Sequence, residues 1–220
     1  MQEAGVKASK NPKHEVVSEE EPARTRILNA AFATFMEHGY AGASTLEIAT
    51  RAKVSKRELY SLFENKEALF AAGVGARTAR MQLQLKFSEI KTDKDLVAAL
   101  SAAGRAILAG VTSPGVLAVY RLAIAESART PKLAATLDKA GRQENRRALG
   151  EMLSSAQRAG LLKTGDVDAM AEHFAALLWT DLLPRLLLRV TPQPSPAEMA
   201  ERAARATDAF VTLFATKPRA

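Results

Sequence analysis

Two helix-start patterns follow one another closely in this chain, between residues 44 and 58. Ser44 is followed three residues later by Glu47, and Ser55 is followed in the same way by Glu58. This is the capping-box pattern, in which each side chain satisfies a free backbone N–H at the start of a helix. Apolar residues at helical spacing should hold the two helices together: Leu46, Ile48, Ala49, Val54, Leu59, Leu62 and Phe63. The sequence therefore predicts two short helices joined by a tight turn at residues 52–54, which is a helix-turn-helix.

The second predicted helix begins with two basic residues, Lys56 and Arg57. A helix-turn-helix presents its second helix to the DNA major groove, where an arginine can bind guanine O6 and N7 together. Tyr60 lies one turn further along and can reach a phosphate, while the helix starts at Thr45 and Lys66 offer free N–H groups that favour anions. The alternative is a solvated surface helix that carries two basic residues, because this geometry also occurs in proteins that do not bind DNA.

A stretch of about fifty residues, from Arg24 to Ala72, resembles the tetracycline-repressor (TetR) family. The resemblance rests on many residues at fixed spacing without a gap: Ile27, Leu28, Ala30, Ala31, Phe35, Gly39, Tyr40, Ser44, Thr45, Leu46, Ile48, Ala49, Val54, Ser55, Leu59, Tyr60, Phe63, Asn65, Lys66, Glu67 and Leu69. It implies a homodimeric transcriptional regulator, most simply a repressor released from a palindromic operator by a small molecule.

The resemblance also assigns roles to single residues. Thr45 and Tyr60 look like phosphate contacts, Lys66 like a backbone-binding lysine, and Lys56 and Arg57 like base-reading positions, with Ser55 beside them at the helix start. Three positions depart from the family pattern. Lys53 stands where the turn often has glycine, Glu58 where threonine is common, and Leu62 where tyrosine or histidine often contacts a phosphate.

The composition favours an all-α fold. Apolar residues make up 47% of the 220 residues and aromatic residues only 5%, with alanine and leucine prominent, which suits helices. The chain has no cysteine, which excludes disulfides and thiolate metal sites, and its net charge of +7 suits a polyanionic partner. No stretch is apolar for the roughly 18 residues of a membrane span and the N-terminus has no signal-peptide core, so we expect a cytoplasmic protein.

Helix-start and helix-stop signals divide the rest of the chain. Residues 1–21 are predicted to be a flexible tail, residues 22–70 the helix-turn-helix domain, and residues 71–220 a helical domain for ligand binding and dimerisation. In the first domain a helix should end at Gly39 and complete a three-helix unit. A fourth helix is expected from residue 65 to about residue 87 or 90. Later helices, at 94–109, 116–129, 132–159, 167–190 and 195–214, are expected to form a helical bundle.

The last two predicted helices are apolar enough to form a dimer interface. The helix after Asp166 is apolar nearly all round, so it must be covered on nearly all sides. One side can pack in its own bundle, and another can meet a second chain about a two-fold axis. The residues predicted for this interface are Phe174, Leu177, Leu178, Asp181, Leu182, Phe210 and Leu213. The alternative is that all of them belong to an internal core.

A ligand pocket is harder to place. Amphipathic side chains among alanine and leucine can orient a mostly apolar guest, and five such residues are candidates: Tyr120, Arg121, Met170, His173 and Trp179. Ordinary packing is the alternative for each of them. The effector itself stays unidentified.

Catalysis is not expected, and no cofactor is predicted. The histidines His14, His38 and His173 have no metal-ligand spacing, so no metal site is predicted, and Asp166 suits a helix cap. Nucleophile-elbow, phosphate-loop and dinucleotide motifs are absent from the sequence. The rival to a DNA-binding regulator is a helical ligand-binding or scaffolding protein with lost or weak DNA binding, because Glu58 and Leu62 depart from the family pattern.

Overall fold

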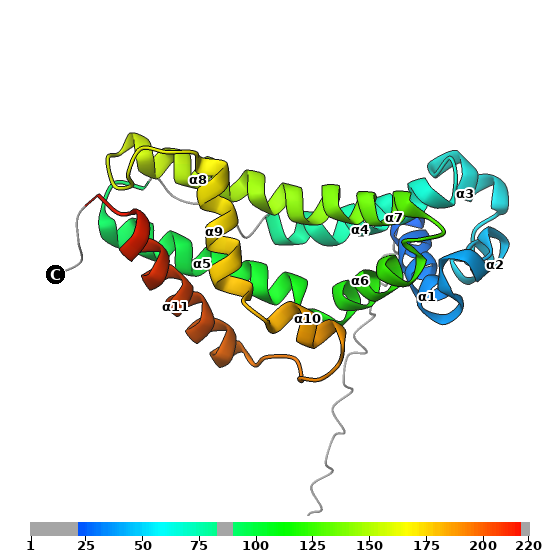
Figure 1. The fold of residues 1–220 in the computed structure, drawn as a ribbon. Coiled ribbons are helices and arrows are strands. Elements are labelled where there is room, and N and C mark those ends of the chain that lie inside the picture. Colours follow the sequence, from blue (N-terminus) through cyan, green and yellow to red (C-terminus); the bar gives the residue numbers. More distant parts are fainter. Residues whose placement is uncertain (1–21, 83–89, 217–220) are drawn as a thin grey trace, which may run out of the picture.

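The computed structural model describes residues 22–82 and 90–216, and within these ranges the chain is helical (Figure 1). The predicted tail, residues 1–21, lies outside the described residues. Four helices form the first part of the chain: α1 (Ala23–Gly42), α2 (Thr45–Arg51), α3 (Lys56–Leu62) and α4 (Lys66–Gln82). Apart from an isolated antiparallel bridge between Leu162 and Ala215, the described residues contain no β-structure. The all-α prediction is therefore confirmed.

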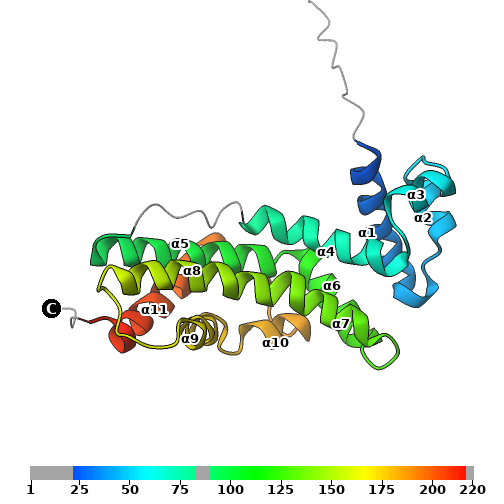
Figure 2. The same ribbon diagram turned by 90° about the horizontal axis from the view of Figure 1, so that it is seen from above.

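The remaining helices form an elongated bundle beside this first unit (Figures 1 and 2). They are α5 (Asp93–Val111), α6 (Pro114–Glu126), α7 (Pro131–Leu137), a π-helical segment η2 (Asp138–Gln143), α8 (Glu144–Arg158), α9 (Val167–Trp179), α10 (Leu182–Leu187) and α11 (Pro196–Phe214). α2 and α3 lie at one end of the molecule, and the N-terminal end of α5 and the C-terminal end of α8 lie at the other (Figure 1).

Several helix starts follow from their capping residues. The Ser195 hydroxyl accepts a hydrogen bond from Glu198 N at 3.2 Å and the Glu198 carboxylate accepts one from Ser195 N at 2.7 Å, so α11 begins with a complete capping box. Asp166 caps α9 as predicted, with its Oδ1 accepting from Asp168 N at 2.8 Å. Thr92 caps α5 and pairs with Asp95 in a second capping box, so the helix begins at Asp93, one residue before the predicted start.

Two predicted helices are interrupted. The segment 167–190 breaks at Thr180, whose φ of 43° is incompatible with a continuing α-helix, so α9 and α10 are separate elements. Pro184, a residue type that can kink a helix, lies inside the short α10 and not at the break. The segment 132–159 contains the π-helical turn η2. α1 is kinked at Gly39, whose φ is 71°, and the helix continues beyond the kink to Gly42.

Two buried clusters hold the molecule together. The first fills the bundle where α5 packs against α11 and α8 against α9, with Phe174 and Phe210 in edge-to-face contact at 5.6 Å between ring centroids. The second lies under α1, α2, α3 and the start of α4, and it extends to α6 and α7 through Val119 and Leu133. This second cluster crosses the predicted domain boundary at residue 70, so the first unit and the bundle share one core.

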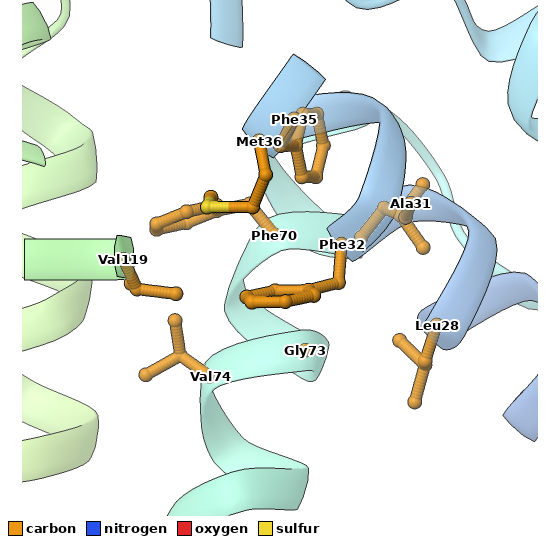
Figure 3. A pocket seen from close by; sticks show the side chains of 10 residues that line it. Leu28, Ala31, Phe32, Phe35, Met36, Phe70, Gly73, Val74 and Val119 are labelled. Carbon is orange, nitrogen blue, oxygen red and sulfur yellow. The ribbon is translucent and has the colours of Figure 1, made fainter. Parts of the chain in front are cut away.

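A small apolar cavity lies in this shared core (Figure 3). It measures about 10 Å³, about the space of one water-sized sphere, so the seam between α1, α4 and α6 is closely packed. The side chains around it come from all three helices: Leu28, Ala31, Phe32, Phe35, Met36, Leu69, Phe70, Gly73, Val74 and Val119.

Among the described residues, no single helix has both the length and the apolar character to cross a membrane. Only α5 and α6 taken together reach that length and composition, and they are bent by 64° from one another.

Candidate DNA-binding site

The two serines predicted to start α2 and α3 do so, although neither forms the complete capping box. Ser44 Oγ accepts a hydrogen bond from Leu46 N at 3.2 Å, and Ser55 Oγ accepts one from Glu58 N at 3.0 Å. Glu47 does not return to Ser44, because its carboxylate contacts Arg51 at 2.6 Å and His38 at 3.1 Å. The serine caps nevertheless fix where both helices begin.

The turn between α2 and α3 depends on Lys53. Its φ is 53°, a left-handed conformation in which glycine costs less than lysine. The Lys53 N–H donates to Thr50 O at 3.1 Å and the Val54 N–H donates to Ala49 O at 3.0 Å, which closes the end of α2. The Arg26 side chain also donates to Ala52 O at 3.0 Å and ties the turn to α1.

A hydroxyl pair connects the start of α2 to the middle of α3. Thr45 Oγ1 and Tyr60 Oη are hydrogen-bonded at 3.0 Å, and Lys56 Nζ lies 5.8 Å from the centre of the Tyr60 ring. Lys56, Arg57 and Tyr60 are all exposed. Within the part of the chain that the structure describes, no ion pair involves Lys56 or Arg57. This face therefore offers two uncompensated cations and two linked hydroxyl groups to an anionic partner.

Lys66, the predicted backbone-binding lysine, points back into the protein. Its ammonium group donates to the carbonyl oxygens of Tyr40 at 2.7 Å, Ala41 at 3.3 Å and Ala43 at 3.2 Å, and it lies 4.6 Å from the centre of the Tyr40 ring. These contacts join the end of α1 to the start of α4. Burial, followed by the nearby Glu67 charge, raises the pKa of Tyr40 to about 12.

The structure shows a cluster of charged side chains on α1 and α2 that the sequence analysis did not predict. Arg51 Nη2 contacts Glu37 at 2.5 Å and Glu47 at 2.6 Å, and the hydrogen bond from Arg51 holds the pKa of Glu37 below its usual value. With His38, these carboxylates are close enough together to suit a metal ion, but Arg51 occupies both of them. The sequence does contain a signal for the Glu47–Arg51 ion pair, because residues four positions apart meet on one face of a helix.

Two leucines assigned to the small core are exposed instead. Leu46 is 59% exposed and Leu62 is 43% exposed, whereas Ile48, Ala49 and Leu59 are buried. Both exposed leucines lie on short helices that bury only one side, so helical spacing alone assigned them wrongly.

The residues predicted for the dimer interface fall into a buried group and a more exposed group. Phe174, Leu178 and Phe210 are completely buried within one chain and Leu182 is nearly so, so these four cannot reach a second subunit. Phe174, Leu178 and Phe210 hold α9 and α11 in the bundle, and Leu182 does the same for α10. Leu177 on α9 is half-buried, Leu213 on α11 is exposed, and the exposed Asp181 lies just before α10.

The five predicted pocket residues have separate partners. Arg121 donates to Leu187 O at 2.9 Å and to Leu186 O at 2.6 Å, which holds the end of α10 against α6. His173 is exposed, with Nδ1 2.7 Å from Ala169 O, while Met170 is buried against Gln157. Tyr120 packs between the two buried clusters and Trp179 packs against the bundle core.

A larger hollow lies elsewhere, outside α10 and the start of α11. This open groove has a volume of about 280 Å³. None of the five predicted pocket residues lines it. Its lining is mostly charged residues and residues of the linker before α11: Asp181, Leu182, Arg185, Thr191, Pro192, Gln193, Pro194, Glu198, Glu201, Arg202 and Arg205.

Comparison with known proteins gives the family of this chain. The profile of the bacterial regulatory proteins of the tetR family matches residues 27–72, and the profile of the AefR-like transcriptional repressor C-terminal domain matches residues 98–216. No curated protein matches the chain.

Solved structures agree with these profiles. A TetR transcriptional regulator from Agrobacterium tumefaciens is 27% identical with a TM-score of 0.75, and the match covers 90% of this chain and 96% of that one. The flavonoid-responsive regulator FrrA is 26% identical with a TM-score of 0.74, over 89% of this chain and 98% of that one. The protein is therefore a member of the TetR family of transcriptional regulators, which are DNA-binding transcription factors and not enzymes.

Proposed function

We propose that this regulator is a homodimeric repressor that acts in the cytoplasm, binds a palindromic operator and is released from it by a small molecule. The observation that carries DNA binding is the exposed face of α3, where Lys56 and Arg57 have no ionic partner among the described residues and Tyr60 is held by Thr45. In this arrangement Arg57 and Lys56 contact base edges, and the two hydroxyl groups contact phosphate oxygens.

The remaining predicted contacts have smaller roles in this proposal. Ser55 Oγ already accepts from Glu58 N, so its contribution is to set the start of α3 and its backbone N–H groups. Lys66 is engaged by three carbonyl groups, and it contacts a phosphate only if it leaves at least one of them.

Dimerisation is proposed to use the outer sides of α9 and α11. Leu213 is 52% exposed and lies one residue before Phe214, whose ring contacts His173 of α9 at 5.5 Å between centroids. An exposed leucine beside an aromatic pair gives apolar area that a two-fold partner can cover with the same residues. Two recognition helices would then lie one or more DNA turns apart, which requires a palindromic or near-palindromic operator.

We propose regulation by a small molecule because the chain is similar to a regulator with a named response to small molecules. FrrA is named as flavonoid-responsive, which supports a responsive bundle in this chain as well. The energetic requirement is that the effector bind one arrangement of the two DNA-binding units better than the other. The close seam of α1, α4 and α6 in Figure 3 provides a direct mechanical connection between bundle and DNA-binding unit.

One observation favours the alternative, a ligand-binding helical protein with weak DNA binding. Glu58 is exposed in the first turn of α3, two residues from Lys56. A negative charge there opposes phosphate binding and lowers the affinity for any DNA.

The deciding experiment is fluorescence anisotropy of the purified protein with duplexes that tile the DNA around its own gene. Shuffled duplexes of the same composition serve as the reference, and each is measured at low and near-physiological salt. We expect a salt-sensitive complex with two protomers on one of the tiled duplexes. Equal affinity for tiled and shuffled duplexes would favour the alternative.

A pair of double variants tests the residues themselves. Lys56→Ala with Arg57→Ala should abolish the preference for the operator, while Lys94→Ala with Arg158→Ala removes the same charge from exposed sites at the far end of the bundle and should keep it. Unchanged operator preference in the first variant would refute the proposed role of α3.

A further inference from the structure

The exposure of Leu46, a leucine of α2, is not explained by the packing of the core. Leu46 is 59% exposed although its neighbours Ile48 and Ala49 are buried and already hold α2 against the core. The core therefore does not require a large apolar side chain at this position. Single exposed apolar residues are common on protein surfaces, so the argument must come from where Leu46 lies.

The two flanks of α2 differ in their partners. Glu47 and Arg51 lie on one flank, and Arg51 contacts Glu37 of α1. Leu46 and Thr50 lie on the other flank, four residues apart on one helix face, and both are exposed. Leu46 and Thr50 are themselves uncharged, and no ion pair within the described ranges engages them.

The Leu46 flank also adjoins α3. Thr45, the residue before Leu46, is hydrogen-bonded to Tyr60, so the start of α2 is held beside the middle of α3. The flank continues through Thr50 to Lys53, the turn residue three positions before Lys56. Leu46 is thus an apolar side chain at the edge of a face that is otherwise basic and hydroxyl-bearing.

In the major groove the apolar group at a base edge is the C5-methyl of thymine. We propose that Leu46 contacts a thymine methyl group in each half of the operator and thereby determines part of the sequence preference. This inference rests on the proposed function, because it requires that α2 and α3 approach the major groove together.

The expected effect follows from the size of one methyl group. Removing one buried methyl should weaken binding about fourfold in one half-site and about fifteenfold when both half-sites of a symmetric operator are changed. Deoxyuridine makes this change alone, since it differs from thymidine only by the methyl group and keeps the pairing with adenine.

The test uses the operator found by tiling, with each symmetric pair of thymines replaced in turn by deoxyuridine. Anisotropy is measured for the full-length protein, Leu46→Ala and Leu62→Ala. We expect one thymine pair at which deoxyuridine weakens the unchanged protein about fifteenfold. Leu46→Ala should bind both duplexes equally and about as weakly as the unchanged protein binds the deoxyuridine duplex, because the same contact is lost in either case.

Leu62→Ala is the matched control, since it removes another exposed leucine from the same unit and should keep the sensitivity to deoxyuridine. Circular dichroism should show the same helix content in all three proteins, because both leucines are largely exposed.

Other results overturn the inference. It fails if no thymine pair affects binding, if Leu46→Ala remains sensitive, or if Leu62→Ala loses sensitivity as well. In each of these cases the protein still prefers its operator to shuffled DNA, so the proposed function survives. A protein with no such preference would refute the proposed function and this inference together.

Discussion

Gly104 lies where α5 packs closely against α11, and its replacement by alanine tests that packing. A Cβ added at Gly104 would be 3.0 Å from the Cβ of Ala203 and 3.2 Å from Cδ1 of Leu178. Ala203 and Leu178 are completely buried, and the Ala203 Cβ is fixed to the backbone of α11. The helices must therefore separate by a few tenths of an ångström to accept the new methyl group.

Two opposing effects set the size of the change. Alanine favours the helix over glycine by about 1 kcal/mol, while forcing an extra methyl into a packed core costs about 1–3 kcal/mol. Gly75→Ala in α4 shows the first effect alone, because a Cβ there meets no atom within 4 Å and only the helix preference should appear. We expect Gly104→Ala to be less stable than Gly75→Ala by about 1–3 kcal/mol.

Urea denaturation followed by circular dichroism measures the free energy of unfolding of both variants and of the unchanged protein. Both substitutions share the glycine-to-alanine difference in helix preference, so their comparison reports the packing between α5 and α11. Equal stability of the two variants, or a more stable Gly104→Ala, would refute the close approach as described.

Three further outcomes follow from other contacts. Tyr60→Phe should weaken operator binding about two- to tenfold without changing the salt slope, because it removes a hydroxyl group and no cation, and anisotropy over a salt series checks both. Glu126→Met should raise the free energy of unfolding by about 1–3 kcal/mol, since the buried Glu126 Oε2 has no hydrogen-bond partner among the described residues; an unchanged urea midpoint would contradict this. Leu213→Asp should weaken the dimer in sedimentation, whereas Leu188→Asp, a change at an exposed leucine on neither α9 nor α11, should not.

Local chemistry in the sequence was sufficient to predict the helix-turn-helix and most helix starts. Ser195 with Glu198 marks the start of α11, and Asp166 marks that of α9, because a cap depends only on residues within one turn of each other. The resemblance also marked Lys53 as a turn position that often has glycine, and its φ is 53°. The roles of the residues on α3 remain predictions, since they depend on a DNA partner.

The side of each helix that meets a partner could not be predicted in the same way. α9 and α11 are apolar on more than one side, so Phe210 and Leu213 look alike in the sequence although the first is completely buried and the second is 52% exposed. Their difference depends on how α5 packs against α11, which involves residues about a hundred positions apart. Arg121 likewise donates to the end of α10, a contact between distant residues that the sequence does not reveal, and the ligand pocket stays a prediction.

The π-helical segment η2 is the one departure that the sequence does encode, in the spacing of its buried residues. From Leu133 to Leu153 buried side chains recur at steps of four, through Leu137, Asn145 and Leu149, with the half-buried Gly141 filling the gap. An α-helix has 3.6 residues per turn, so a stripe with steps of four drifts by about 40° per step and by about 120° from Leu133 to Asn145.

A π-helix winds more slowly, at about 4.4 residues per turn, so a six-residue segment absorbs about 110° of that drift. The buried residues before and after η2 can then face the same side of one long rod. α4 packs against both α7 and η2, so the wide turn lies where the helix leaving the DNA-binding unit meets the bundle. The drift of the stripe between Leu133 and Asn145 thus matches the π-helical segment that lies between them, whereas a search at the α-helical period interprets residues 131–158 as a single regular helix.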